Sequence, residues 1–243
     1  MNDPETFGHP ITTMPMVLMY HSVDHYEQDP HLVTVTPERF EQQLRWLHTR
    51  GLRGVSVREL LDAHAKGGTR GLVGLTFDDG YADFATRAVP TLMRFGFTAT
   101  VFVVAGNVGT FNSWDTGPAK SLMTEDQLKA VADYGMEVAS HGVRHVSLPD
   151  ASTEAVRDEL RNSRLILEDI VRRPVTGFAY PYGDVGPRDP GEVKRAGYDY
   201  ACAIRPREPG RYALARTYVG ERDRSLRLRA KVVRHELQWL VRV

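Results

Sequence analysis

Two short segments of the 243-residue sequence carry side chains that could bind a metal and transfer protons. Asp78 and Asp79 follow an apolar run and precede Gly80, so they lie where a buried strand is expected to end. His141 and His145 follow a second strand-like segment. Two histidines and one carboxylate leave a fourth position open for water, which favours a catalytic metal site over a structural one.

Either segment alone has a simpler interpretation. An Asp-Asp-Gly sequence is also common in turns, and a His-x-x-x-His spacing arises by chance on polar surfaces. Here both segments follow expected strands in successive strand–loop units, and chance does not explain that placement. Since active sites of α/β proteins lie at the carboxyl ends of their strands, we expect the two segments to form one site.

Together with a third segment, residues 178–183, these two segments resemble the motifs of the polysaccharide deacetylases of carbohydrate esterase family 4. The motifs occur in the same order and at similar spacing through residues 15–219. The resemblance implies an α/β fold, a distorted (β/α) barrel of about seven parallel strands. It also implies a hydrolase acting on linear amide C–N bonds, which removes acetyl groups from N-acetylated sugars.

The resemblance implies a role for each residue of the site. Asp79, His141 and His145 would bind a divalent metal, with Zn²⁺ expected first and Co²⁺, Ni²⁺ or Mn²⁺ as alternatives. Asp78 would accept a proton from the attacking water. The backbone N–H of the residue matching Tyr182 would stabilise the negative charge that develops on the carbonyl oxygen.

The histidine that acts as catalytic acid is expected near the N-terminus. In the main form of the family it lies near the C-terminus, whereas a circularly permuted branch carries it in an N-terminal Tyr-His. Tyr20-His21 follows the first expected strand and resembles that branch, so we predict that His21 protonates the leaving amine. The alternatives are that His21 only occupies a turn, or that His235 in a basic helical segment is the acid.

The sequence departs from the main family pattern in two places. Residue 179 is alanine where many members have an arginine that orients the base. Arg216 follows the strand-like segment 212–215 and could take that role from another strand end; otherwise it is a surface arginine. No C-terminal strand ends in a histidine. Both departures agree with the permuted branch.

The expected partner is an N-acetylated glycan or a sugar-containing precursor. Tyr182 and Pro181 are expected to contact it. Trp114 and Phe111, in the long loop 105–120, could stack on a sugar ring or could instead pin the loop to the barrel. Two other functions remain open, which are metal-dependent hydrolysis of a non-sugar or small cyclic amide and carbohydrate binding without turnover.

The composition and the order of the expected strands and helices limit the possible architectures. The 31 basic residues balance the 31 acidic residues, so no global charge favours nucleic acid. Alternating strands and helices at this length predict one domain over residues 15–243, after an irregular tail at 1–14. Cys202 is the single cysteine, which excludes an intrachain disulfide, and it is expected to be buried.

Several helices are predicted from their capping residues. Thr36, Ser56 and Thr124 each precede a helical pattern, and the latter two have the spacing of a capping box. A long helix is predicted at 153–171, with Leu160 on its apolar face and its Arg and Glu residues in water.

A basic amphipathic helix is predicted from Ser225, with Leu226, Val233 and Leu237 among its apolar residues and Trp239 near its end. It could close the barrel, or it could make a peripheral membrane contact. The N-terminus shows neither a signal-peptide pattern nor a transmembrane span, so we expect a cytoplasmic protein, at the inner membrane face if this helix binds lipid. The sequence does not predict the oligomeric state.

Overall fold

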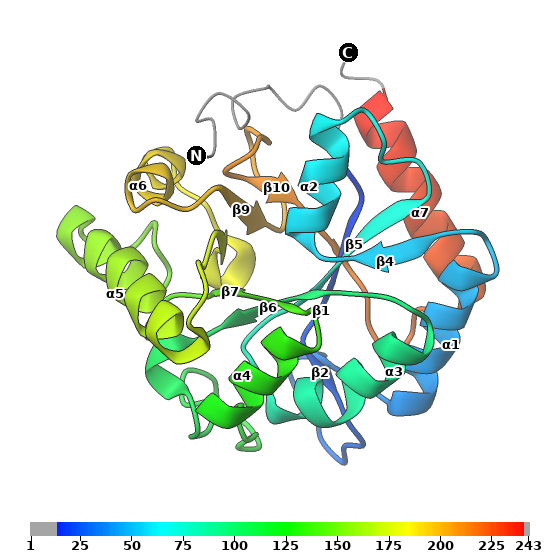
Figure 1. The fold of residues 1–243 in the computed structure, drawn as a ribbon, viewed down its shortest axis with the longest axis horizontal. Helices are drawn as coiled ribbons and strands as arrows, with labels where there is room; N and C mark the ends of the chain where they lie inside the picture. The colour runs from blue at the N-terminus through cyan, green and yellow to red at the C-terminus, as the bar shows by residue number, and fades with distance from the viewer. Residues whose placement is uncertain (1–13, 241–243) are drawn as a thin grey trace.

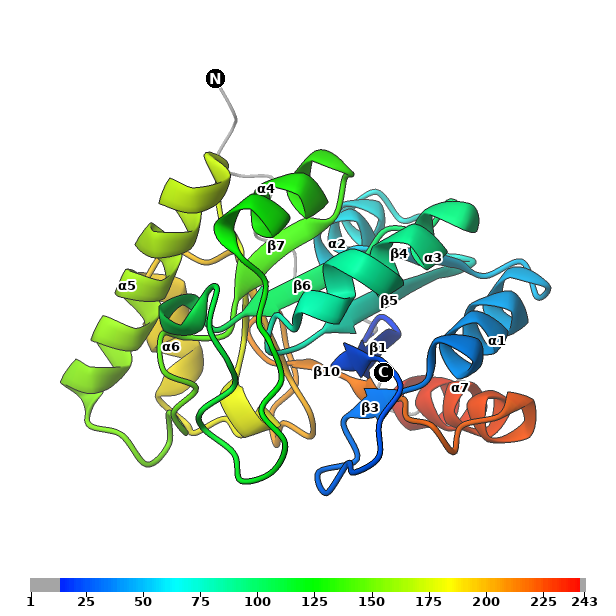
Figure 2. The ribbon, with the colours of Figure 1, turned by 90° about the horizontal axis from the view of Figure 1, so that it is seen from below.

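The computed structural model describes residues 14–240, without the side chains of residues 236 and 238–240. The predicted irregular tail therefore lies outside the described residues, apart from Met14. Figure 1 shows strands surrounded by helices, and Figure 2 shows the same arrangement from below.

One parallel sheet curves into a nearly closed barrel, which confirms the predicted α/β barrel. Its strand order is β10-β9-β8-β7-β6-β5-β1-β11, with β4 also paired to β5. The described sheet has nine strands where about seven were predicted, because β4 has only three residues and the last predicted strand is divided into β10 and β11. The bounds are β1 (Val17–Tyr20), β4 (Arg53–Val55), β5 (Leu72–Phe77), β6 (Thr100–Val103), β7 (Glu137–Ser140), β8 (Gly177–Ala179), β9 (Tyr200–Ala203), β10 (Leu214–Ala215) and β11 (Thr217–Tyr218).

The interruption in the last strand joins the two edges of the sheet. Leu214 pairs with Cys202 of β9, whereas Thr217 pairs with Leu18 of β1. The chain therefore crosses from one sheet edge to the other within a few residues. Arg216, between β10 and β11, lies at the crossing point and has a buried side chain.

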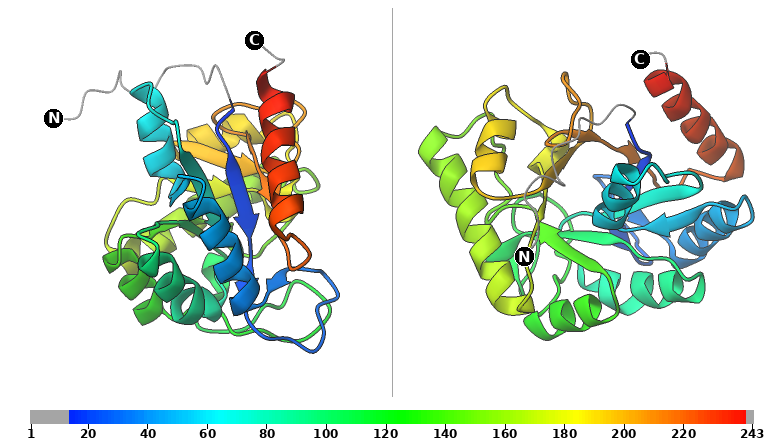
Figure 3. Two further views of the ribbon diagram at one scale, coloured as in Figure 1. Left: turned by 90° about the vertical axis from the view of Figure 1, so that its right-hand side faces the viewer. Right: turned by 45° about the horizontal axis from the view of Figure 1, so that its top comes forward.

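The helices cover the outside of the barrel, as the two views of Figure 3 show. None of the helices in residues 14–240 combines the length and the hydropathy of a membrane span. A π-helical segment at Phe84–Ala88 leads into α3. The bounds are α1 (Pro37–His48), α2 (Val57–Ala65), α3 (Val89–Arg94), α4 (Glu125–Asp133), α5 (Thr153–Val171), α6 (Asp189–Arg195) and α7 (Ser225–Leu240).

Helices α1, α2 and α4 begin at the predicted N-cap residues. Thr36 accepts a hydrogen bond from the Arg39 amide, and Thr124 forms a complete capping box with Gln127. At α2 only half of the predicted box forms. Ser56 accepts from the amide of Glu59, but the Glu59 carboxylate binds Arg53 and Thr98 instead.

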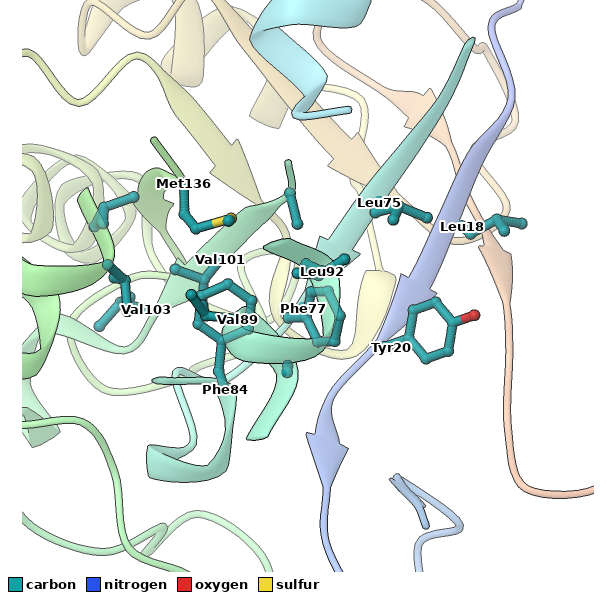
Figure 4. Packing of buried hydrophobic residues seen from close by; sticks show 14 of the residues in the cluster. Leu18, Tyr20, Leu75, Phe77, Phe84, Val89, Leu92, Val101, Val103 and Met136 are labelled. Atoms are coloured by element: carbon teal, nitrogen blue, oxygen red, sulfur yellow. The ribbon is translucent and has the colours of Figure 1, made fainter. Parts of the chain in front are cut away.

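The core has two parts, because alternate residues of each strand face opposite sides. In β6, Val101 and Val103 pack toward the helices, while Phe102 packs inside the barrel with Cys202 and Leu214. Figure 4 shows part of the outer layer, where Phe77 of β5 lies among helix residues. Cys202 is buried, as predicted.

A small second sheet lies beside the carboxyl ends of the barrel strands. It consists of β2 (Ser22–Val23) and β3 (Thr34–Val35), which pair in parallel immediately after His21. Two short 3-10 segments, η3 (Ala105–Asn107) and η4 (Pro181–Gly183), follow strands β6 and β8. These connections surround the end of the barrel to which the sequence motifs map.

Candidate metal and catalytic site

Neighbouring strands bring the two sequence motifs together. Asp79 follows β5 and His141 follows β7, and both strands pair with β6 between them. His145 lies on the loop after β7. The Oδ1 atom of Asp79 is 3.6 Å from Nε2 of His141 and 3.4 Å from Nε2 of His145. All three residues are buried.

These three side chains fit a metal ion. One potential ligand atom from each lies within 4.8 Å of the others. Asp79 Oδ1 is buried without a hydrogen-bond partner among the described residues, which is costly unless a cation is bound. Nδ1 of His141 lies 2.8 Å from the carbonyl oxygen of Ala179. Since a carbonyl can only accept, Nδ1 carries the proton and the lone pair of Nε2 faces Asp79.

The backbone is strained where these ligands lie. Asp79 has a φ of 74° and His145 a φ of 57°, in the left-handed region that residues with a side chain seldom adopt. Tyr182, on η4, has a φ of 61°. Such strain persists only where the surroundings enforce it, and it is concentrated at functional sites.

Burial changes the pKa values of the three candidate metal ligands. It lowers the pKa of His141 to about 4, and burial together with His141 lowers the pKa of His145 to about 2. Both imidazoles are therefore neutral near pH 7, which is the form that ligates a metal. Burial and the neighbouring Asp78 carboxylate raise the pKa of Asp79.

Asp78 forms a bidentate ion pair with Arg216. Nη1 and Nη2 of the arginine donate to the two carboxylate oxygens at 2.5 and 2.7 Å. Burial acts to raise the pKa of Asp78, but Arg216, with His141 and His21, lowers it to about 2. Arg216 is thus not the surface arginine of the alternative interpretation. It lies where the base-orienting arginine predicted from the sequence would lie.

His21 lies level with Asp78. Tyr20 pairs with Phe77, and the Asp78 amide donates to the Tyr20 carbonyl at 3.0 Å, so the residues that follow the two strands are neighbours. Burial lowers the pKa of His21, and the Asp78 carboxylate opposes that effect. The other predicted acid, His235, lies on α7 against the Met14 carbonyl at 3.1 Å.

Two aromatic rings pack against the imidazole of His145. Trp114 stacks on its imidazole with a centroid distance of 4.8 Å, and Tyr182 meets it edge-on at 4.5 Å. Trp114 therefore packs on a candidate metal ligand, and Phe111 of the same loop is exposed. Tyr182 is 48% exposed, whereas Pro181 is buried.

Glu159 of α5 is a contributor that the sequence analysis did not identify. The acidic residues of this helix were predicted to face water, but Glu159 is buried. Its Oε2 accepts from the amides of Val143 and Arg144 at 2.7 and 3.0 Å, and its Oε1 accepts from Nε of Arg144 at 2.6 Å. It therefore holds the loop between the two histidines. Its spacing of three from the buried Val156 is the signal that could have identified it.

A second set of hydrogen bonds that was not predicted involves β2, which begins directly after His21. The Ser22 hydroxyl donates to Asp83 at 2.6 Å, and the Asp83 carboxylate also accepts from the amide of Val23 at 2.9 Å. Lys120 donates to the hydroxyls of Ser22 and Thr34 at 2.7 and 2.8 Å. These contacts join the β2–β3 sheet to Asp83 and Lys120, which are distant from it in the sequence, so no local pattern could reveal them.

Comparison with known sequences places the chain in a family. The model of the polysaccharide deacetylase family matches residues 65–201, which include both metal-ligand motifs. The chain belongs to the polysaccharide deacetylase family. Membership places it among hydrolases that cleave amide bonds, as the resemblance implied.

Two curated relatives illustrate the range of this family. YxkH of Bacillus subtilis, named for the same family, is 28% identical over 209 residues, which cover 84% of this chain and 70% of YxkH. A poly-beta-1,6-N-acetyl-D-glucosamine N-deacetylase of Staphylococcus aureus is 25% identical over 181 residues, 70% of this chain. The match spans 61% of the length of that enzyme.

Solved structures share the barrel over nearly the whole chain. The Streptococcus pyogenes deacetylase PplD, in complex with acetate, superposes with a TM-score of 0.76 at 23% identity and covers 92% of this chain and 99% of its own. IcaB from Ammonifex degensii gives 0.74 at 23% identity, covering 90% and 97%. At these identities the likeness establishes the fold.

A groove of about 1050 Å³ begins at Tyr182. One wall includes Ser147, Pro149 and Asp150 of the loop after β7, and a second wall includes Ile204 and Tyr212 of the segment after β9. The amide of Ile204 donates to the Gly183 carbonyl at 3.2 Å and fixes the second wall against η4. Trp114 is not among its lining residues, so the prediction that this ring stacks on a sugar along the groove gains no support from the structure.

Proposed function

We propose that the protein is a metal-dependent N-deacetylase of glycans, or glycan precursors, that contain N-acetylhexosamine. The observation that carries this proposal is the Asp79–His141–His145 cluster beside a carboxylate, Asp78, that Arg216 holds ionised. The name of the Staphylococcus aureus relative supports the substrate class. The groove supports an extended substrate over a small cyclic amide, because Tyr182 both contacts His145 and lines the groove, so a chain of sugars could continue from the site into it.

Asp79, His141 and His145 would hold the metal. When bound there, a divalent ion would supply Lewis-acid chemistry, which makes water more acidic and polarises a carbonyl oxygen. Zn²⁺ suits two neutral imidazoles and one carboxylate, and Co²⁺, Ni²⁺ and Mn²⁺ can share such ligands.

The remaining residues would handle protons and charge. Asp78, kept ionised and oriented by Arg216, would accept the proton of the attacking water. The backbone N–H of Tyr182 would donate to the developing oxyanion. His21, in its protonated form, would give a proton to the departing amine, which is otherwise a poor leaving group. Tyr182, which lines the groove, would border the bound sugar.

Acetate release tests this function. The protein is loaded with Zn²⁺ and given β-1,6-linked N-acetylglucosamine oligomers, with a small cyclic amide as the competing substrate class. We expect equimolar acetate and free amine from the oligomers, loss of activity with chelator, and recovery on adding metal back. Metal-loaded Asp78→Asn is the matched control. Turnover of the cyclic amide alone, or no acetate from any N-acetylhexosamine oligomer, would contradict the proposal.

A further inference from the structure

Helix α7 is attached to the barrel by one face only. Leu228 is buried, Val232 is partly buried, and His235 contacts the Met14 carbonyl. Lys231 donates to the Tyr218 carbonyl at 2.7 Å and pairs with the Asp223 carboxylate. Figure 1 and the left view of Figure 3 show the helix along the outer flank of the molecule.

The opposite face of α7 is apolar and exposed. Leu226 is 80% exposed, Val233 42% and Leu237 60%, and Ala230 between them is also exposed. Their spacings of four, three and four residues place them in one line along the helix, which we call the apolar stripe. The sequence pattern is the same whichever face of this helix meets the barrel, and the structure leaves these four residues outside it.

Arginines border the apolar stripe on both sides. At 3.6 residues per turn, Arg227 and Arg234 lie on one side and Arg229 on the other. Arg222 and Arg224 precede the helix. All five are exposed, and none forms an ion pair with another residue in the described part of the chain. Arg222, Arg227 and Arg234 also line a pocket that contains the carboxylates of Asp29, Glu221 and Asp223, whereas Arg224 and Arg229 do not.

A cleft of about 450 Å³ separates α7 from the segment that follows β9. Arg205 and Arg234 line its opposite walls, and none of the described residues that line it is acidic. Arg216 also reaches this cleft but is paired with Asp78, so Arg205 and Arg234 are the guanidinium groups left to bind an anion. The cleft thus has the charge needed for a phosphate group.

We propose that α7 and this cleft form a binding surface for anionic lipid membranes. The apolar stripe would lie in the boundary between headgroups and acyl chains, and the bordering arginines would contact lipid phosphates. One headgroup phosphate would enter the cleft between Arg205 and Arg234. Charge complementarity favours this partner over a second copy of the chain, because two stripes packed together would bring unpaired arginines close to one another.

Vesicle flotation tests the surface. The full-length protein is mixed with vesicles of phosphatidylcholine, with or without phosphatidylglycerol. We expect binding only with phosphatidylglycerol, decreasing as salt rises. Arg227→Gln with Arg234→Gln should weaken binding about fivefold for each charge. Leu226→Ser with Leu237→Ser should weaken it about tenfold or more, because two exposed leucines no longer enter the lipid.

A matched control distinguishes vesicle binding by this surface from nonspecific adsorption of exposed apolar residues. Leu165 and Ile166 of α5 are 53% and 36% exposed and lie on another helix, so Leu165→Ser with Ile166→Ser should leave vesicle binding unchanged. All variants should keep the thermal stability of the parent protein, since none changes a buried side chain.

Four results would overturn the proposal. They are absence of binding to phosphatidylglycerol vesicles at low salt, an equal loss in the α5 control, complete competition by millimolar inorganic phosphate, and a dimer in light scattering that Leu237→Ser dissociates. The third result would indicate a site for a soluble anion, and the fourth would make the apolar stripe an interface between copies.

Discussion

Asp78 and Arg216 are 138 residues apart in sequence, yet the guanidinium group spans both carboxylate oxygens of Asp78 inside the barrel. The contact exists because the interrupted last strand crosses from β9 to β1 and turns Arg216 inward. A buried carboxylate without a cation would tend to bind a proton. Arg216 therefore keeps Asp78 ionised and fixes the direction of its oxygens.

The first prediction concerns this pair. Asp78→Asn should retain the metal and lower kcat about 10²- to 10⁴-fold, because an amide cannot accept the proton of water. Arg216→Lys keeps the charge but cannot reproduce the bidentate contact, so it should lower kcat about 10- to 100-fold. Steady-state kinetics with matched metal content check both. Wild-type kcat in Arg216→Lys would show that charge alone suffices.

The second prediction tests the leaving-group acid. His21→Ala should slow an N-acetyl substrate at least about tenfold more than an O-acetyl substrate, since an alkoxide leaves with less help from a proton than an amine does. His25→Ala, at an exposed histidine of the following loop, serves as the control and should affect neither. Equal losses on amide and ester would argue against His21 as the acid.

The third prediction concerns metal content. The purified protein should bind about one divalent ion per chain, and His141→Ala or His145→Ala should abolish stoichiometric binding. Chelation should also lower Tm, because an ion that binds only the folded chain stabilises it. Elemental analysis and thermal melting provide the readouts, and His48→Ala, an exposed histidine of α1, is the control. Full metal occupancy in either histidine variant would disprove this ligand set.

The fourth prediction assigns a positioning role to Glu159. Glu159→Ala removes all three contacts to the loop between the histidines, so Zn²⁺ affinity should fall about 10- to 100-fold. Arg144→Ala removes the ion pair but leaves the backbone contacts, and should change affinity little. Competition with a chromophoric chelator measures both. If the two variants weaken Zn²⁺ binding equally, the ion pair with Arg144, and not the contacts to the loop amides, positions the histidines.

The fifth prediction concerns the thiol. Burial raises the pKa of Cys202 to about 12, so near pH 8 only about one thiol in 10⁴ would be ionised. The folded protein should therefore not react with a disulfide reagent, whereas one thiol per chain should react in guanidinium chloride. Rapid labelling of the folded protein would show that the inner layer of the barrel opens.

The sequence by itself determined the strand ends that carry Asp78, Asp79, His141 and His145. Such placement depends on local information, because an apolar run that stops at polar residues defines a strand and its end. Helix starts at Thr36 and Thr124 followed for the same reason.

Only the tertiary structure decided the partners of these residues. Arg216 could be a surface residue or an orienting residue until barrel closure brought it to Asp78. Glu159 lies on a helix whose charged residues were expected in water, and its carboxylate instead binds loop amides. The apolar residues of α7 likewise gave no indication of which face meets the barrel. In each case the deciding contact joins segments far apart in sequence, and local periodicity carries no information about such pairs.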